Sequence, residues 1–267
     1  MTDKILIVIP SLEPDEKLVE LTGELKREGF SHILIVNDGS GPAYDDIFAR
    51  AVAEGDCRLL THRVNQGKGR AMKTAFNEFL LHPDGCEGIV TVDSDGQHRP
   101  ADIRKCCEAL LAHPDSLILG SRNFDEKGVP LKSSFGNKLT RKIFGFLSGI
   151  HIRDTQTGLR GFSPALVRRF LSTPGERFEY EMNMLMDCRE YNIPVLEVPI
   201  QTVYLEGNAS THFHPVRDSI RIYAIFGKFL ATSLSSSVID IVLFTVFSGI
   251  LQWLHLGHVI LAATVGA

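Results

Sequence analysis

Two stretches early in the chain repeat one order, a continuous aliphatic run followed by an amphipathic segment. Ile5 to Ile9 and Ile33 to Val36 are aliphatic at every position, and apolar residues recur at helical spacing after the first run, at Leu18, Leu21 and Leu25. Strands that are apolar on both faces occur in parallel sheets covered by helices. The repeat therefore predicts an α/β fold with a mostly parallel, Rossmann-like sheet.

Later segments extend the alternation. We expect further strands at 58–61, 88–92, 117–122 and 195–200, of which the last is edge-like because it contains Pro199. We expect further helices at 44–54, from about 68 to 81, from 100, at 133–147 and from 178.

The run from Gly88 to Val92 ends in a cluster of oxygen-bearing side chains. Alternation along a strand places Asp93, Asp95 and Gln97 on one side. Three such ligands at the carboxyl end of a parallel strand suit a hard divalent cation, Mg²⁺ or Mn²⁺, that also binds substrate phosphates. The alternative interpretation is that these residues form an Asp/Gly turn that caps the next helix and bind no metal.

Two further segments point to the same end of the sheet. Asp38 follows the second strand, where its carboxylate could accept hydrogen bonds from a base or a ribose. The alternative is that Asp38 forms an Asx-turn. Lys68 lies between two glycines at the start of a helix, an arrangement that can bind a phosphate group. The alternative is that the glycines only allow the chain to enter the helix. Neither a Walker A loop nor a G-x-G-x-x-G fingerprint is present, which argues against a nicotinamide dehydrogenase.

Several charged side chains in the second half of the expected sheet domain are candidates for substrate binding. The arginines suit phosphate groups, although one or two of them could instead pair with a carboxylate. The acidic residues at the expected helix start near 179 also suit the helix dipole. The set comprises Arg122, Arg141, Arg153, Asp154, Arg160, Glu179 and Glu181.

Net charge and cysteine pattern exclude some classes of protein. A formal charge of −4 argues against a nucleic-acid-binding domain, which is normally basic. Five cysteines without a C-x-x-C pair indicate reduced thiols that face the cytoplasm. No signal peptide precedes the first strand, so we expect the N-terminal part to stay in the cytosol.

The end of the chain is apolar. Phe229 to Leu254 contains one charged residue, Asp240, and is long enough to span a bilayer, although a buried amphipathic helix is the alternative. Asp240 would then face other helices, and Arg217, Arg221 and Lys228 place the start of the span in the cytoplasm.

A second apolar segment, 259–267, is too short to cross a bilayer, and we therefore expect the chain to be truncated. We expect a catalytic domain over 1–222 and a membrane segment over 223–267.

Several motifs occur in the order found in family-2 glycosyltransferases. The chain most resembles the polyprenyl-phosphate sugar synthases of the dolichol-phosphate mannose synthase group, over roughly residues 4 to 222. The region from Lys228 to Asp240 resembles the opening of the small GtrA-like membrane proteins. The motifs are Pro10, Val36 to Ser40, Asn65 to Ala71, Asp93 to His98, Gly120 to Arg122, Asp154 to Phe162 and Phe178 to Glu181.

The resemblance implies a GT-A fold, a UDP- or GDP-sugar donor, a divalent metal (Mg²⁺ or Mn²⁺) and a polyprenyl phosphate acceptor at the cytoplasmic face of the cell (inner) membrane. It implies that Asp38 contacts the base and that Arg122 and Arg160 face phosphates. The full assignment is catalytic for Asp93, Asp95, Arg122, Asp154 and Arg160; nucleotide-sugar-binding for Pro10, Asp38, Lys68, Asp93 and Asp95; acceptor-binding for Arg141, Arg153, Arg160, Glu179 and Glu181; and metal-binding for Asp93, Asp95 and Gln97.

One motif departs from the family pattern. The first strand commonly ends P-x-Y-N-E, whereas Leu12 and Pro14 stand here in place of the aromatic and the acidic residue. The choice of nucleotide is therefore open.

The chemistry separates the possible acceptors. A lipid monophosphate is ionised at pH 7 and needs no strong base, so the site must chiefly stabilise the leaving nucleoside diphosphate with a metal and cationic side chains. A sugar hydroxyl would need a general base, for which Asp154, Glu179 and Glu181 are the candidates. Transfer to a saccharide in cell-envelope polysaccharide synthesis, and a non-catalytic membrane scaffold, are the alternative functions.

Overall fold

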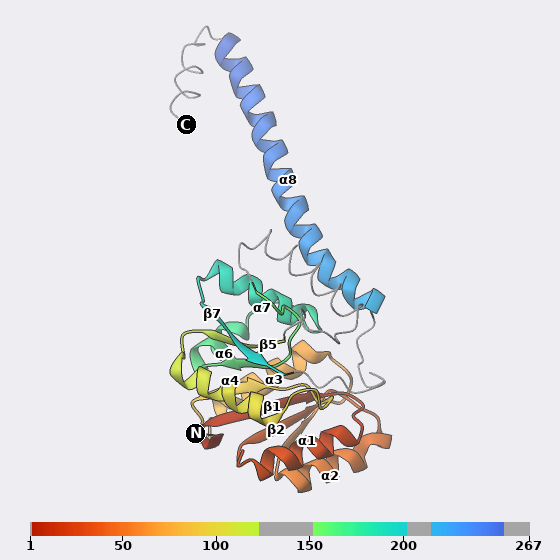
Figure 1. Ribbon diagram of the computed structural model, residues 1–267. Helices are drawn as coiled ribbons and strands as arrows, with labels where there is room; N and C mark the ends of the chain where they lie inside the picture. Colours follow the sequence, from red (N-terminus) through yellow and green to blue (C-terminus); the bar gives the residue numbers. More distant parts are fainter. Residues whose placement is uncertain (1, 123–151, 202–214, 254–267) are drawn as a thin grey trace. The chain divides into compact units, whose positions relative to one another are not determined.

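The computed structural model describes residues 2–122, 152–201 and 215–253 (Figure 1). The chain divides into two compact units, Met1–Asp218 and Ser219–Ala267. The expected helix at 133–147, with Arg141, and the second apolar segment at 259–267 lie outside the described residues.

The first unit is built on a mostly parallel sheet in the order β3-β2-β1-β4-β6-β5-β7. Every pair of neighbouring strands is parallel except those that involve β6. The α/β prediction and the positions of the expected strands are confirmed. The strands are β1 (Ile5–Ser11), β2 (Ile33–Asn37), β3 (Arg58–Thr61), β4 (Gly88–Thr91), β5 (Leu117–Arg122), β6 (Arg160–Phe162) and β7 (Val195–Ile200).

Strand β6 was not expected from the sequence, where 151–162 reads as a polar loop. It inserts antiparallel between β4 and β5, with Arg160 opposite both Thr91 and Leu119. Three residues that include a glycine and an arginine carry almost no periodic signal. The insertion brings the preceding segment, 154–159, beside the carboxyl end of β4.

Helices cover both faces of this sheet (Figure 1). Except for α6, which was not expected from the sequence, each lies where a helix is expected. Prolines stand at the first turn of α4 and α6, where no backbone N–H is needed. The helices are α1 (Glu16–Arg27), α2 (Asp45–Gly55), α3 (Lys68–Leu81), α4 (Pro100–Ala112), α6 (Pro164–Phe170) and α7 (Glu179–Glu190), with short 3-10 turns at Thr2–Lys4 and Pro42–Tyr44.

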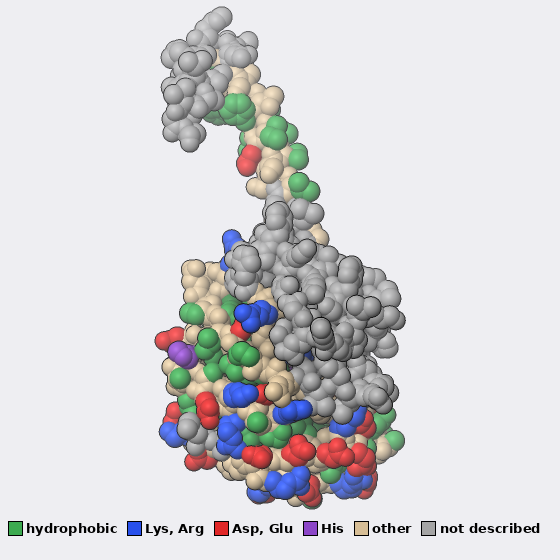
Figure 2. Space-filling view, in the orientation of Figure 1, with side chains coloured by type: hydrophobic (Ala, Val, Ile, Leu, Met, Phe, Trp, Pro, Cys, Tyr) green, Lys and Arg blue, Asp and Glu red, His purple; other side chains and the backbone are tan. Residues whose placement is uncertain are grey.

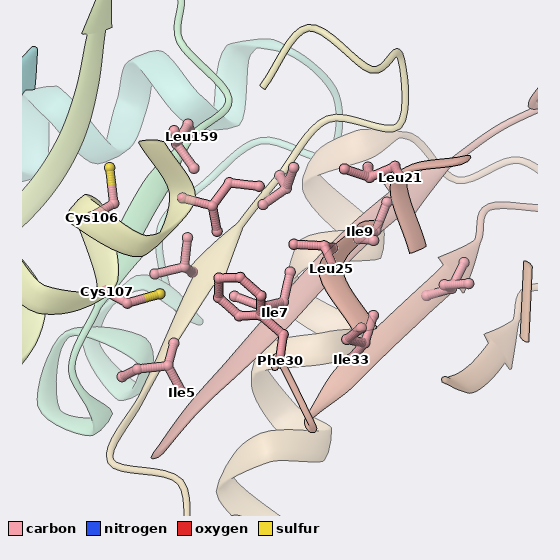
Figure 3. Packing of buried hydrophobic residues seen from close by; sticks show 14 of the residues in the cluster. Ile5, Ile7, Ile9, Leu21, Leu25, Phe30, Ile33, Cys106, Cys107 and Leu159 are labelled. Atoms are coloured by element: carbon pink, nitrogen blue, oxygen red, sulfur yellow. The ribbon is translucent and has the colours of Figure 1, made fainter. Parts of the chain in front are cut away.

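One face of the sheet packs against α1 and α4 through aliphatic side chains (Figure 3). Alternate residues of β1 (Ile5, Ile7 and Ile9) share this cluster with Leu25 and Phe30. All five cysteines are buried and unpaired, and burial raises the pKa of the Cys57 thiol to about 12. The cysteines therefore act here as small apolar side chains.

The other face carries an aromatic stack. Phe162 of β6 lies edge-on to Phe76 of α3 and to Phe170 of α6, with ring centroids 5.0 and 5.8 Å apart. These buried rings compensate for the short length of β6, because edge-to-face pairs add to the stabilisation from buried area.

The described part of the second unit is helix α8 (Pro215–Trp253), which starts before the unit boundary. Its segment Leu234–Leu251 is long and apolar enough to cross a membrane. Large apolar side chains such as Ile241 and Phe247 are exposed, and hydrophobic groups are visible along this helix in Figure 2. The segment lies within the expected span, Phe229 to Leu254.

Candidate active site

The carboxyl ends of β2, β1 and β4 lie side by side and carry the polar residues expected there. Ser11 is opposite Asn37, and the backbone of Val92, just after β4, donates to Val8 of β1. In sheets of this kind, ligands bind beyond the carboxyl ends of the strands.

The turn that follows β4 contains Asp93, Asp95 and Gln97. The backbone N–H of Gln97 donates to Asp95 Oδ1 over 3.0 Å, and Gly96 adopts a φ of 73°, which glycine tolerates best. A Cβ atom at Gly158 would lie 2.3 Å from Asp93 Oδ2, so the segment before β6 packs directly on that carboxylate. A side chain at position 158 would have to displace the Asp93 carboxylate.

Lys68 joins two other expected site residues. Its Nζ lies 2.7 Å from Asp93 Oδ1 and 2.9 Å from Glu181 Oε1, so the starts of α3 and α7 and the turn after β4 meet at one ammonium group. Burial alone would lower the pKa of Lys68, but the two carboxylates outweigh it and raise that pKa. Burial would raise the pKa of Asp93, but Lys68 and His98 outweigh it and lower that pKa.

Asp95 has the opposite electrostatic setting. Burial and the nearby charge of Asp93 raise the pKa of Asp95. A divalent cation would stabilise its ionised form, so the site fits such an ion on electrostatic grounds.

Within 2–122, 152–201 and 215–253, no group of three or more His, Cys, Asp or Glu side chains is arranged to hold a metal. The protein would thus supply few ligands, Asp95 and Gln97 with Asp93 beside them. Water and substrate phosphates would supply the rest, as is usual for Mg²⁺.

Asp38 anchors the loop that starts α3. Its carboxylate accepts hydrogen bonds from the backbone N–H groups of Gln66 and Gly67, at 3.0 and 2.7 Å, and lies 2.7 Å from His62 Nδ1. The turn after β2 is formed instead by Asn37, whose Oδ1 accepts from the backbone of Ser40. The expected contact of Asp38 with a base stays a prediction.

The glycines on either side of Lys68 have a packing role. Gly67 has a φ of 105°, and a Cβ there would lie 2.4 Å from the carbonyl oxygen of Glu176. A Cβ at Gly69 would lie 2.6 Å from Tyr180 Cβ. The start of α3 is thereby pressed against the start of α7, which delivers Lys68 to Glu181.

Arg122 and Asp154 form one of the ion pairs that the sequence left open. Arg122 Nε donates to Asp154 Oδ2 at 2.5 Å and a terminal nitrogen donates to Oδ1 at 3.1 Å, and Asp154 has no exposed surface. Arg153 is exposed, and its backbone N–H donates to Glu197. Asp154 therefore orients the Arg122 side chain at the tip of β5.

Arg160 makes internal contacts in the structure, and its expected contact with a phosphate stays a prediction. Its side chain is fully buried, and its guanidinium donates to the carbonyl oxygens of Thr157 and Glu181 at 2.9 and 2.7 Å. In this arrangement Arg160 ties the segment before β6 to α7. A phosphate contact would require this network to open, because the guanidinium is not exposed.

Glu179 also makes internal contacts. Its Oε1 accepts from the backbone N–H groups of Glu176 and Arg177, which lie just before α7. This agrees with the expectation that acidic residues suit the start of this helix.

Three residues of this site were missed in the sequence. His98 is buried, with Nε2 3.6 Å from Asp93 Oδ2 and with Nδ1 lacking a hydrogen-bond partner. His62 bridges Asp38 and Thr74, and Gly158 packs on Asp93. The position of His62 directly after the strand 58–61 was a usable signal, whereas the position of Gly158 depends on β6.

Comparison with known proteins agrees with this fold and identifies a family. Residues 7–172 match the family described as glycosyl transferase family 2. The UDP-N-acetylglucosamine–dolichyl-phosphate N-acetylglucosaminyltransferase of Methanococcus voltae is 28% identical over 77% of this chain and 88% of its own. The polyprenol monophosphomannose synthase of Mycolicibacterium smegmatis is 26% identical over 74% of this chain and 77% of its own.

A solved structure supports the fold. The glucosyl-3-phosphoglycerate synthase of Mycobacterium tuberculosis, crystallised with Mn²⁺, UDP and glucosyl-3-phosphoglycerate, has a TM-score of 0.62 and 18% identity, covering 87% of this chain and 79% of that one. The fold is thus of the GT-A type. The chain belongs to glycosyltransferase family 2 and is a glycosyltransferase.

Proposed function

We propose that this glycosyltransferase transfers a sugar from a UDP- or GDP-sugar to a polyprenyl phosphate at the cytoplasmic face of the cell membrane, with the help of Mg²⁺ or Mn²⁺. One relative described above is named for the transfer of N-acetylglucosamine to dolichyl phosphate, and the other for the synthesis of polyprenol monophosphomannose. The apolar segment of α8 is suited to keep the enzyme where such a lipid resides.

The internal contacts of the acidic side chains carry this proposal. A saccharide hydroxyl would need a general base, yet Asp154 is buried against Arg122, Glu181 is held by Lys68, and Glu179 accepts two backbone hydrogen bonds. A phosphate monoester is already ionised and needs no such base. The site is therefore better suited to a lipid phosphate than to a free sugar.

The reaction is a displacement at the anomeric carbon. An oxygen of the lipid phosphate forms a bond to that carbon, while the bond from the carbon to the nucleoside diphosphate breaks and the electron pair leaves with the diphosphate. When bound, the divalent cation supplies Lewis-acid stabilisation of the leaving diphosphate.

The protein's own groups position the reactants. Asp95 and Gln97 would hold the cation, with Asp93 beside them, and Pro10, Asp38 and Lys68 would lie near the donor. Arg122, oriented by Asp154, would face a phosphate. Arg141, Arg153, Arg160, Glu179 and Glu181 stay proposed acceptor residues, of which Arg153 is exposed in the described structure.

Release of nucleoside diphosphate tests the proposal. The full-length protein in detergent is incubated with Mn²⁺ or Mg²⁺ and a panel of UDP- and GDP-sugars, with undecaprenyl phosphate, dolichyl phosphate, free sugars or no acceptor. We expect release that depends on one of the lipid phosphates and stops with EDTA. Release with a free sugar but with no lipid phosphate would contradict the proposal, and failure to bind any nucleotide would favour a scaffold.

A further inference from the structure

Lys68 occupies the space between two carboxylates from distant parts of the chain. Its ammonium lies 2.7 Å from Asp93 Oδ1 and 2.9 Å from Glu181 Oε1. The side chains of Lys68, Asp93 and Glu181 are 17%, 30% and 10% exposed, so solvent screens these pairs only weakly. The ammonium is a fixed positive charge and not a mobile surface group.

Both oxygens of Asp93 face other groups of the protein. Oδ1 receives Lys68, while Oδ2 lies 3.6 Å from His98 Nε2 and close to the backbone at Gly158. Asp95, two residues later, has a different environment, in which Oδ1 accepts from the backbone of Gln97. The two acidic residues of the turn are thus not equivalent.

We propose that Lys68 is the resident counter-ion of Asp93 and, through it, a positioning residue for the divalent cation. By neutralising Asp93, Lys68 directs the cation to Asp95 and Gln97. Glu181 then acts on the cation site through Lys68. This inference rests on the proposed function, because it concerns the cation of that same donor site.

The consequence of removing the ammonium follows from the charges that remain. Among the described residues, removal of Lys68 leaves His98 paired with Asp93, and it leaves Arg160 near Glu181, with Arg160 Nε 4.0 Å from Oε1. The site becomes more negative by one charge. A divalent cation should then bind more tightly, by about tenfold for one charge a few ångströms away in a partly screened site.

Mn²⁺ binding to the full-length protein in detergent, without donor or acceptor, tests this effect. Electron paramagnetic resonance counts the free Mn²⁺ in a titration at pH 7. We expect Lys68→Met to tighten Mn²⁺ binding about tenfold and Lys68→Arg, which keeps the charge, to remain near the wild type. Glu181→Gln removes a negative charge and should weaken binding.

Lys73 provides a matched control on the same helix. Its Nζ donates to the carbonyl oxygen of Gly175 at 2.9 Å and to Glu176 at 3.2 Å, and its side chain is 10% exposed. These partners are not the two carboxylates that Lys68 contacts, Asp93 and Glu181. Lys73→Met removes a buried cation between the same two regions. We expect it to lower the melting temperature and to leave Mn²⁺ affinity unchanged.

Weaker or unchanged Mn²⁺ binding in a folded Lys68→Met variant would overturn the inference. If that variant does not fold, Glu181→Gln decides, and unchanged or tighter binding there would overturn it. A wild type that binds no Mn²⁺ would overturn both the inference and the metal in the proposed function. Lys68-dependent Mn²⁺ binding without lipid-dependent turnover would overturn the proposed acceptor and support the inference.

Discussion

Two aspartates in one turn differ in charge environment because different groups face them. Lys68 and His98 lower the pKa of Asp93, whereas burial and the charge of Asp93 raise the pKa of Asp95. The sequence D-S-D cannot show this difference, since the decisive charge comes from α3. In the absence of a cation, the ionised form of Asp95 costs folding free energy.

Asp95→Asn should therefore stabilise the metal-free protein at pH 7 while it removes activity. Added Mn²⁺ should raise the melting temperature of the wild type but not of the variant, because a cation-binding carboxylate is lost. Differential scanning fluorimetry with and without Mn²⁺ measures both effects. The exposed Asp115→Asn serves as control, and an equal Mn²⁺ response in Asp95→Asn would exclude Asp95 as a ligand.

The pH dependence has a definite sign. A raised folded pKa means that the folded state binds the proton of Asp95 more tightly than the unfolded state does. The stability penalty is absent below the ordinary aspartate pKa of about 3.9, and it grows as the pH rises through the raised folded pKa. The advantage of Asp95→Asn should accordingly increase from acid to neutral pH, and an advantage that is largest in acid would contradict this assignment.

At the scale of elements, the start of α3 depends on close backbone packing. Gly67 combines a left-handed φ of 105° with a position where a Cβ would meet the Glu176 carbonyl oxygen at 2.4 Å. Its N–H also donates to Asp38. One residue thus links β2, α3 and the segment before α7.

Gly67→Ala should lower the free energy of unfolding by about 1–3 kcal/mol, the usual cost of a strained backbone position. Urea unfolding measures the change. Gly41→Ala is the control, since Gly41 has a φ of −70° and no atom within 4 Å of an added Cβ. Equal stabilities of the two variants would refute this account of Gly67.

The strands and helices could be expected from the sequence to different degrees. β1, β2 and β4 are aliphatic runs and α3 has periodic apolar residues, so local pattern locates them. β6 could not be found, because its stability comes from pairing with β4 and β5 and from the rings packed around Phe162. Its insertion also places Arg160 in the interior.

At the scale of the whole molecule, α8 extends an exposed apolar surface from Leu234 to Leu251. Val242, near the middle of that segment, is 54% exposed. Such a surface is stable in a hydrocarbon environment and costly in water.

Val242→Lys should weaken membrane insertion, because a lysine at a span centre costs about 2.5–3.5 kcal/mol on the insertion scale. The measurement is the fraction of full-length protein that resists alkaline carbonate extraction from membranes. Leu81→Lys, at a 63% exposed apolar position of the first unit, is the control and should not change that fraction. Equal extraction of both variants would contradict a spanning role for this segment.

The sequence by itself determined the α/β class, most of the elements and the polar edge of the sheet, since these depend on periodicity and on the residues that end each apolar run. Only the tertiary structure decided which charged side chains form ion pairs with one another. Lys68 and Glu181 are 113 positions apart, and Arg122 and Asp154 are 32 apart. The reason is physical: local pattern reflects which face of an element is buried, whereas the pairing of charges depends on which ends of the elements the packed sheet brings together.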